Sequence, residues 1–232
     1  MKVIVEELDQ FAYVVSHDLR SPLQGIELLA QWIMDDDADN LSEDSFQNFQ
    51  RLQERTKWLG ELLDDLLEYS RSGRMLGDIS LVDGSQLIDE LDGLLNPTGA
   101  FHVMVASNAP LPVFNTYSAP FKMVMRNLID NAIKHHNKPN GVIKISCNQG
   151  HPAYYEIQVS DDGPGIPVDR QEKIFGMFKS YEIDPAKRST GVGLALIKKT
   201  VESFGCNVWV ESQANRRPGS IFSFTWPKEV QS

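Results

Sequence analysis

The 232-residue sequence has only two cysteines, Cys147 and Cys206, and no long run of apolar residues. Two isolated cysteines form neither a metal-ligand spacing nor a disulfide framework, and they fit a reducing cytoplasm as small core residues. The apolar runs are too short to cross a bilayer, and the first residues lead directly into Glu6 and Glu7 rather than into a signal peptide. We therefore expect a cytoplasmic chain without a membrane segment.

Net positive charge is also lacking, since the formal charge is −10 at pH 7. This charge argues against a nucleic-acid partner, because such proteins neutralise phosphates with clustered lysine and arginine. It also means that a bound polyphosphate needs local positive charge. The composition itself is ordinary for a globular protein, with 41% hydrophobic and 23% charged residues in a chain long enough for one large or two small domains.

Two long stretches near the N-terminus show helical periodicity. Apolar residues recur every three or four positions over about 6–37 and again up to about Arg71, as in helices with one buried face. The acidic segment 35–40 separates them, so the helices should form an antiparallel hairpin. One hairpin cannot bury both apolar stripes, and we expect a second copy to complete a four-helix bundle. The alternative is that the hairpin packs on the rest of its own chain.

The periodicity changes at residues 73–78, which we predict to be a linker between a helical hairpin at 1–72 and a second domain at 79–232. Short alternating segments and helical segments are mixed in the second domain. The expected elements are helices at 83–95, 118–136 and 192–204 and strands at 102–106, 142–148, 154–160, 208–212 and 220–226. The sequence therefore predicts an α+β multidomain protein, in which the second domain is an α/β sandwich with helices on one face of a sheet.

The segment 16–22 lies within the first predicted helix and carries His17, Asp18 and Pro22. His17 falls off the apolar stripe, and Pro22 removes a backbone donor one turn later, which bends or loosens a helix. A neutral imidazole beside a carboxylate can act as a nucleophile, because the carboxylate can hold the proton on the other ring nitrogen. An ordinary surface histidine is the alternative reading of this segment alone.

Three clusters in the second domain indicate phosphate chemistry. The first is a polar helix face formed by Asn127, Asn131, Lys134 and His135, and its amide oxygens and ammonium suit a hydrated Mg²⁺ and its phosphates. In the second, 161–167, glycines let the backbone approach a flat ligand, and an acid after a strand can accept from an exocyclic amine such as that of adenine. The third, 189–194, opens a helix whose backbone N–H groups form an anion site. Taken singly, these clusters also fit an amphipathic helix, a strand-to-helix turn and a capped helix.

The order and spacing of these segments resemble the cytoplasmic core of sensor histidine kinases, over about 10–227. That family joins a dimerisation and histidine-phosphotransfer hairpin to the ATP-binding domain shared with gyrase, Hsp90 and MutL, a Bergerat-type fold. The matching segments are 17–22 for the phospho-acceptor motif, 127–135 for the asparagine box, 161–165 and 190–194 for the two glycine boxes, and 172–178 for the phenylalanine motif.

The resemblance implies a protein-histidine kinase that uses ATP and Mg²⁺. His17 would accept the γ-phosphoryl group with Asp18 as base or orienter, Asn131 would ligate Mg²⁺, and Asp161 would read adenine. The implied nucleotide-binding residues are Asn127, Asn131, Lys134, His135, Asp161, Gly163, Gly165, Ile166, Arg188, Thr190, Gly191, Val192, Gly193 and Leu194. Residues 179–190 would form a mobile lid with Arg188 towards the γ-phosphate, braced by the packing of Phe175 and Phe178.

Asn127 stands where the related ATPases carry a water-activating glutamate. An amide cannot take that proton, so wasteful hydrolysis should be slow. This residue disfavours a gyrase-like hydrolase. A non-catalytic nucleotide-binding scaffold or anti-activator is the other alternative, and the intact pair of His17 and Asp18 argues against it.

The implied partners are a second copy in a homodimer and the receiver domain of a response regulator, whose aspartate takes the phosphoryl group from His17. Only about sixteen residues precede His17, too few for a sensor domain, so we expect a separate or deleted sensor, with a haem-based nitric-oxide sensor as one candidate. The sequence departs from the family pattern at four positions. Ser21 replaces a common threonine or asparagine linked to phosphatase activity, Ser189 replaces a glycine and should stiffen the lid end, Asp162 replaces an asparagine, and Cys206 replaces a glycine.

Overall fold

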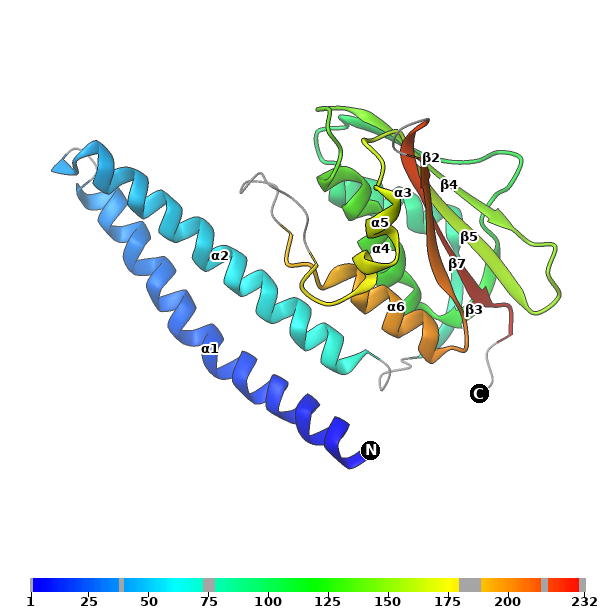
Figure 1. The fold of residues 1–232 in the computed structure, drawn as a ribbon, viewed down its shortest axis with the longest axis horizontal. Helices are drawn as coiled ribbons and strands as arrows, with labels where there is room; N and C mark the ends of the chain where they lie inside the picture. Colours follow the sequence, from blue (N-terminus) through cyan, green and yellow to red (C-terminus); the bar gives the residue numbers. More distant parts are fainter. Residues whose placement is uncertain (1, 38–39, 73–77, 180–188, 214–216, 230–232) are drawn as a thin grey trace. The chain divides into compact units, whose positions relative to one another are not determined.

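The structure, a computed structural model, describes residues 2–37, 40–72, 78–179, 189–213 and 217–229 (Figure 1). Within these ranges, the side chains of residues 2–17, 37, 213 and 217 lie outside the description. The chain divides into two compact units, Met1–Arg71 and Ser72–Ser232. Among the described residues, no helix combines the length and apolarity needed to span a bilayer.

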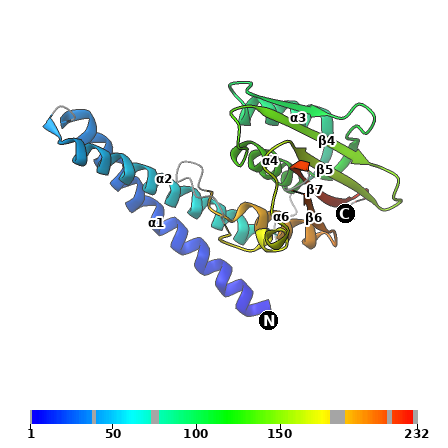
Figure 2. The same cartoon turned by 45° about the horizontal axis from the view of Figure 1, so that its top comes forward.

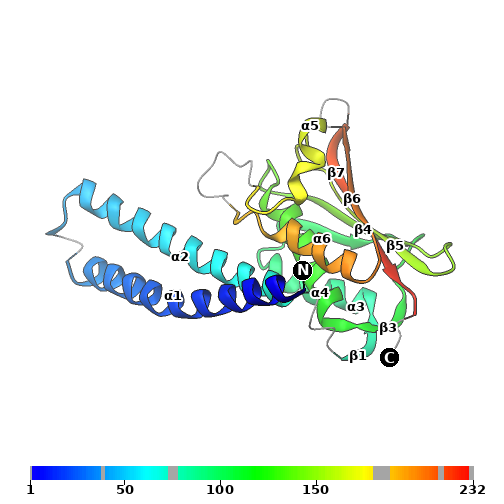
Figure 3. The same cartoon turned by 60° about the horizontal axis from the view of Figure 1, so that its bottom comes forward.

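The first unit is a pair of long helices, α1 (Lys2–Asp37) and α2 (Glu43–Arg71), which lie side by side in Figure 3. Helix α1 continues through Pro22. The backbone N–H of Ser45 donates to the hydroxyl of Ser42 at 3.2 Å, which caps α2. An ion pair joins Arg20 to Asp64, and Gln53 Nε2 donates to Gln31 Oε1 at 3.1 Å. The partners are 44 residues apart in the first pair and 22 in the second, so the two helices run in opposite directions. This confirms an antiparallel hairpin.

The hairpin leaves much of its apolar stripe in solvent. Ala30, Leu63 and Leu67 are buried. Six other stripe residues are 38–56% exposed, namely Leu19, Ile26, Leu29, Ile33, Leu52 and Leu59. One hairpin therefore does not cover its own apolar face, as the sequence predicts.

The second unit contains two antiparallel strands and a separate five-stranded sheet. Strands β1 (Ile79–Asp83) and β3 (Val113–Tyr117) form the small sheet. The large sheet has the order β2–β4–β5–β7–β6, with β2 and β4 parallel and the other pairs antiparallel. Its strands are β2 (Phe101–Val105), β4 (Gly141–Asn148), β5 (Tyr154–Asp161), β6 (Val208–Gln213) and β7 (Arg217–Pro227).

Helices cover one face of this sheet, as Figure 1 and Figure 2 show. They are α3 (Gly84–Leu95), α4 (Ser118–Lys134) and α6 (Gly193–Ser203), with the short α5 (Val168–Gln171) and the 3₁₀ turn η2 (Lys173–Phe175) between β5 and α6. Helix α3 begins where the Asp83 carboxylate accepts from the backbone N–H groups of Ser85 and Gln86. All three predicted helices are confirmed, whereas β1 and β3 were not predicted.

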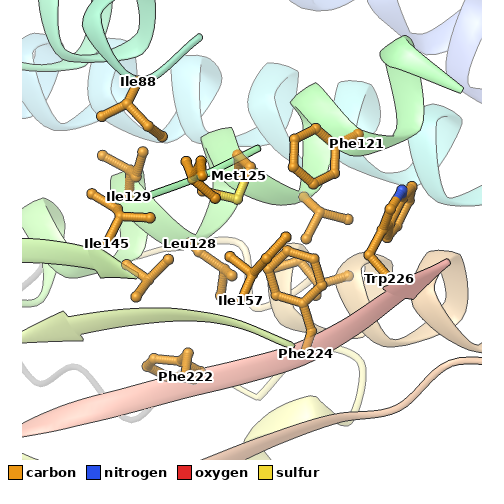
Figure 4. Packing of buried hydrophobic residues seen from close by; sticks show 14 of the residues in the cluster. Ile88, Phe121, Met125, Leu128, Ile129, Ile145, Ile157, Phe222, Phe224 and Trp226 are labelled. Atoms are coloured by element: carbon orange, nitrogen blue, oxygen red, sulfur yellow. The ribbon is translucent and has the colours of Figure 1, made fainter. Parts of the chain in front are cut away.

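The core lies between α4 and the large sheet (Figure 4). Helix α4 turns Phe121, Met125 and Leu128 inwards at helical spacing, and they meet Phe224 and Trp226 of β7. Trp226 also donates its indole N–H to Thr116 Oγ1 at 2.8 Å, in a bond that is buried at both ends and ties β7 to β3. Because α4 faces the core along one side, its polar residues are held in a fixed position on another side.

Candidate nucleotide-binding site

Asn127 and Gly193 bring the asparagine box of α4 against the start of α6. The side-chain amide of Asn127 donates to the Met123 carbonyl at 2.9 Å. Its oxygen faces Gly193, where a Cβ would lie 3.0 Å from Asn127 Oδ1. A Cβ at residue 193 would crowd the Asn127 side chain by a few tenths of an ångström, so glycine there lets the first backbone N–H groups of α6 approach α4. The structure thus brings together two of the segments that the sequence singled out.

Asn131, one turn further along α4, carries a buried polar atom without a partner. Its Nδ2 has no hydrogen bond within the described part of the chain. The two ends of an amide exchange places by a half-turn of the side chain, so the same spot can present an oxygen. A buried, unpaired amide is costly unless a ligand satisfies it, which makes Asn131 a fit position for a cation or a phosphate.

A bound Mg²⁺ would find few protein ligands here. Among the described residues, no three histidine, cysteine, aspartate or glutamate side chains cluster as a metal site. Mg²⁺ commonly keeps several waters and binds through one or two protein groups together with substrate phosphates. The Asn131 amide therefore fits a magnesium ion that arrives with its nucleotide.

Lys134 and His135 complete the polar end of α4. Lys134 Nζ lies 2.8 Å from Asp130 Oδ2, one turn earlier on the same helix, and both side chains are partly exposed. His135 follows the helix and donates its backbone N–H to the Asn131 carbonyl at 3.1 Å. The ammonium of Lys134 is thus bound to a carboxylate in this structure, whereas the sequence analysis assigned it to phosphate.

Asp161 is the last residue of β5, and backbone N–H groups from two segments hold its carboxylate in place. Its carboxylate accepts from the backbone N–H of Gly163 at 2.8 Å and from that of Ser220 on β7. Burial raises the pKa of Asp161 above its ordinary value, although these hydrogen bonds act in the opposite direction. A Cβ at Gly163 would lie 2.8 Å from Asp161 Oδ1, so only glycine fits beside the carboxylate.

The rest of this loop is fastened to β6. Gly165 has a φ of +76°, which favours glycine. The backbone N–H of Ile166 donates to Ser212 Oγ at 2.8 Å, and the Gln171 amide donates to the carbonyls of Ile166 and Ser212. The first glycine box is therefore held between β5 and β6 as a rigid turn.

Gly219 on β7 was missed by the sequence analysis. Its φ is +105°, and a Cβ there would lie 2.0 Å from the Asp161 carbonyl oxygen. A glycine inside a strand is a signal of close backbone approach that could have identified it. This contact lets β7 bring the Ser220 N–H to the Asp161 carboxylate.

His136 and Asp162 form a second feature that the sequence analysis did not predict. The buried ring of His136 places Nε2 3.0 Å from Asp162 Oδ1, and the backbone N–H of Val142 donates to the same oxygen at 2.7 Å. These hydrogen bonds lower the pKa of Asp162, with that from Val142 contributing most. The sequence noted Asp162 only as a departure from the family pattern.

The second glycine box packs on the segment that follows η2. Gly191 has a φ of +71°, and a Cβ there would lie 2.7 Å from the backbone nitrogen of Lys179 and 2.8 Å from the carbonyl carbon of Phe178. The Val192 N–H lies 3.4 Å from Thr190 Oγ1, and Leu194 follows in the first turn of α6. Of the expected lid, residues 180–188, and with them Arg188, lie outside the described residues.

The two phenylalanines of the phenylalanine motif differ in their surroundings. Phe175 packs its ring edge against Phe222 at a centroid distance of 6.4 Å, next to the buried Ile174. Phe178 is 58% exposed and has a φ of 59°, which is unusual for a residue with a side chain. Phe175 therefore contributes to packing as expected, and Phe178 contacts Gly191 through its backbone.

His17 and Asp18 belong to the first unit. His17 lies midway along α1, and its side chain lies outside the described part of the chain. The Asp18 side chain is exposed. Arg20, three residues after His17, forms the ion pair with Asp64 that joins the two helices at this level.

Comparison with known proteins assigns a family to each unit. The description "His Kinase A (phospho-acceptor) domain" matches residues 7–74, and "Histidine kinase-, DNA gyrase B-, and HSP90-like ATPase" matches residues 116–230. The chain belongs to the histidine kinase family. This confirms the family resemblance that the motifs indicate. It also confirms the predicted fold, which is a helical hairpin followed by an α/β sandwich of the ATPase type.

Relatives of this histidine kinase chain are longer than the chain itself. Cyanobacterial phytochrome B of Nostoc sp. is 35% identical over 95% of this chain and 29% of its own length. The adaptive-response sensory kinase SasA of Thermosynechococcus vestitus is 31% identical over 94% of this chain and 60% of its own. The methanogenesis regulatory histidine kinase FilI of Methanothrix harundinacea is 30% identical, with coverages of 95% and 25%. The chain thus spans 25–60% of the length of these relatives.

Solved histidine kinases share the fold. Full-length ShkA in complex with AMPPNP has a TM-score of 0.70 at 22% identity, over 96% of this chain and 47% of that one. Histidine kinase ThkA in complex with the response regulator TrrA has a TM-score of 0.64 at 23% identity, with coverages of 98% and 64%. At these identities the likeness concerns the fold.

Proposed function

We propose that this chain is an ATP-dependent protein-histidine kinase, which phosphorylates itself on His17 and passes the phosphoryl group to an aspartate of a response-regulator receiver domain. The observation that carries the proposal is the presence, in one chain, of a phospho-acceptor hairpin and an ATPase-type domain in which the buried Nδ2 of Asn131 has no hydrogen-bond partner among the described residues. A nucleotide-binding scaffold alone would need no imidazole beside a carboxylate at residues 17 and 18.

The nucleotide would be held by groups from three segments. Asp161 would accept from the exocyclic amine of adenine, while Gly163, Gly165 and Ile166 keep its loop against the base. The backbone N–H groups of Thr190, Gly191, Val192, Gly193 and Leu194, at the positive end of α6, would bind phosphate oxygens. On α4, Asn131 and Asn127 would face the phosphates, with Lys134 and His135 at the edge, and Arg188 would contact the γ-phosphate.

Mg²⁺, bound through Asn131 and the phosphates, would neutralise charge on the β- and γ-phosphoryl groups. A lone pair on one ring nitrogen of neutral His17 forms the new bond to the γ-phosphorus. The bond from that phosphorus to the β–γ bridging oxygen breaks, and ADP leaves. Asp18 holds the proton on the other ring nitrogen and stabilises the positive charge that develops on the imidazole.

Asn127 explains why the site would favour transfer over hydrolysis. Its amide nitrogen is engaged with the Met123 carbonyl at 2.9 Å, and neither end of an amide takes a proton from water near neutral pH. With no carboxylate in this place, water is not activated and the γ-phosphoryl group is kept for His17.

The exposed apolar stripe of the hairpin supports a homodimer, because two copies can cover the same face of each other. The receiver domain would bind the flank of this bundle near His17. The relatives are longer than this chain, which leaves room in them for a sensor, and a separate or deleted sensor would supply the signal that controls this kinase. A cytoplasmic location fits the proposal, since ATP is abundant there and both buried cysteines are free thiols.

The test is incubation of the purified chain with γ-labelled ATP and Mg²⁺. We expect a label on the protein that is lost in acid, is absent from the His17→Gln variant and moves to a receiver domain. The matched control is His102→Gln, because His102 is an exposed histidine on β2 and is not among the residues assigned to the nucleotide or to phosphoryl transfer. Absence of label on the unaltered chain, or equal label on His17→Gln, would contradict the proposal.

A further inference from the structure

His136 links the three segments that surround the Asp161 loop. Its side chain has no exposed area, although it follows α4 by two residues. The ring contacts Asp162 after β5 and Gly141 at the start of β4, and the edge of Phe101 on β2 packs against it at a centroid distance of 5.3 Å. A histidine buried so completely is held in a single orientation.

The hydrogen bonds of the ring fix which nitrogen carries the proton. The backbone N–H of Lys138 lies 3.1 Å from Nδ1, and the Lys138 carbonyl lies 3.3 Å from the same atom. Because a backbone N–H can only donate, the nearer contact makes Nδ1 the acceptor. Nε2 then carries a proton and donates to Asp162 Oδ1 at 3.0 Å, where the Val142 N–H also donates.

Gly141 and Gly163 leave room for the His136 ring, because a side chain at either residue would crowd it. A Cβ at Gly141 would lie 2.5 Å from His136 Nε2. A Cβ at Gly163 would lie 3.2 Å from His136 Cδ2 and 2.8 Å from Asp161 Oδ1. Gly163 is therefore packed between the imidazole and the carboxylate of Asp161, and its own N–H is one of the donors to that carboxylate.

We propose that His136 is a positioning residue for nucleotide-base selection: by binding Asp162 and packing under Gly163, it fixes the orientation in which the Asp161 carboxylate meets the exocyclic amine of adenine. This inference rests on the proposed function, because the role of Asp161 in reading adenine is part of that proposal. His136 itself touches the loop and not the nucleotide. Its loss should therefore impair the choice between bases more than the binding of phosphates.

The readout is the ratio of dissociation constants for inosine triphosphate and ATP, measured by calorimetry with the whole chain. Inosine carries a 6-oxo group in place of the 6-amino group, whereas its phosphates are the same. We expect His136→Ala to lower the preference for ATP at least about tenfold, the loss expected when a hydrogen bond to a charged group is misaligned. Binding of inosine triphosphate should change less than about threefold.

Three further variants keep the test decisive. Asp162→Ala removes the acceptor for His136 and should lower the preference as His136→Ala does, whereas Asp162→Asn retains an oxygen acceptor and should restore it. Thr116→Val is the stability control, because it breaks the buried bond to Trp226 far along the chain from this loop. It should leave the preference unchanged even if the domain is destabilised. Should His136→Ala fail to fold, the two Asp162 variants decide the question.

The possible results separate this inference from the proposed function. If the unaltered chain binds both nucleotides equally, or binds neither, the role of Asp161 and the proposed function fail. If Asp161→Asn removes the preference for ATP while His136→Ala and Asp162→Ala keep it, only the positioning role of His136 is overturned. The same holds if these two variants weaken both nucleotides by equal factors, which is the result expected of a purely structural residue.

Discussion

Replacement of Gly219 by alanine should disturb both the fold and the end of the site where we propose that adenine binds. Gly219 has a φ of +105°, and its neighbour Ser220 donates its backbone N–H to the Asp161 carboxylate. A Cβ at residue 219 would lie 2.0 Å from the Asp161 carbonyl oxygen, where ordinary contacts begin at 3.4 Å. Alanine has no rotatable side chain with which to escape, so β7 must move away from β5 by more than 1 Å.

Gly205 is the matched control for this substitution. Its φ is +69°, and a Cβ there meets no atom within 4 Å. Gly205→Ala therefore has only the conformational penalty of a left-handed backbone, about 1–2 kcal/mol. For Gly219→Ala we expect at least about 3 kcal/mol, because the displaced strand is hydrogen-bonded to both β5 and β6. That loss is a large share of the roughly 5–15 kcal/mol that stabilises a typical domain.

Hydrogen exchange of the backbone amides in β5 and β7 measures this loss in the second unit alone. We expect much faster exchange in Gly219→Ala than in Gly205→Ala. Where Gly219→Ala still folds, ATP affinity should fall, since the Ser220 N–H moves away from Asp161. Equal protection in the two variants would contradict this prediction and would show that the backbones of β5 and β7 are not as close as the structure places them.

Three further predictions concern the acids around the site. Asp161→Asn should weaken ATP binding about 10- to 100-fold by calorimetry. It should not lower the free energy of unfolding of the nucleotide-free protein at pH 7. Burial raises the pKa of the Asp161 carboxyl, so its charged form is the one that costs stability. The pKa of Asp162 is lowered, so its carboxylate stabilises the native state above the ordinary pKa of 3.8. This stabilisation is lost as the pH falls through the lower pKa of the native state. The urea midpoints of the unaltered chain and of Asp162→Asn should therefore converge at that low pH. Asp130→Asn frees the Lys134 ammonium and should strengthen ATP binding about twofold, with the gain reduced at high salt.

Periodicity explains which elements the sequence predicts. Helix α4 places Phe121, Met125 and Leu128 on one side at helical spacing, and β4 alternates between buried and exposed residues, so both patterns are local and readable. The β1–β3 pair is different. Ile79 pairs with Tyr117 far along the chain, and β1 buries only Val82 of its five residues, so its sequence shows no alternation.

Contacts between distant residues explain what the sequence does not reveal in the site. His136 and Asp162 are 26 residues apart, and Gly219 approaches Asp161 from a different strand. No spacing rule connects such residues, because the connection depends on how β4, β5 and β7 align. The pair of Asp130 and Lys134 was readable in principle, since an acid four residues before a lysine on a helix favours an ion pair.

The two units must be stabilised in different ways, because their large apolar side chains lie in different surroundings. Phe121, Leu128 and Phe224 of the second unit are fully buried within that unit, whereas Leu29 and Ile26 of the hairpin remain about half exposed. Apolar area gains free energy only when it is removed from water, at about 25 cal/mol per Å². The hairpin therefore needs a second apolar surface, and an identical copy provides one by symmetry. In the proposed homodimer, His17 lies in the part of the protein whose stability depends on concentration, while the proposed nucleotide site lies in the part with its own closed core. Dilution should therefore reduce phosphorylation of His17 before it reduces the binding of ATP.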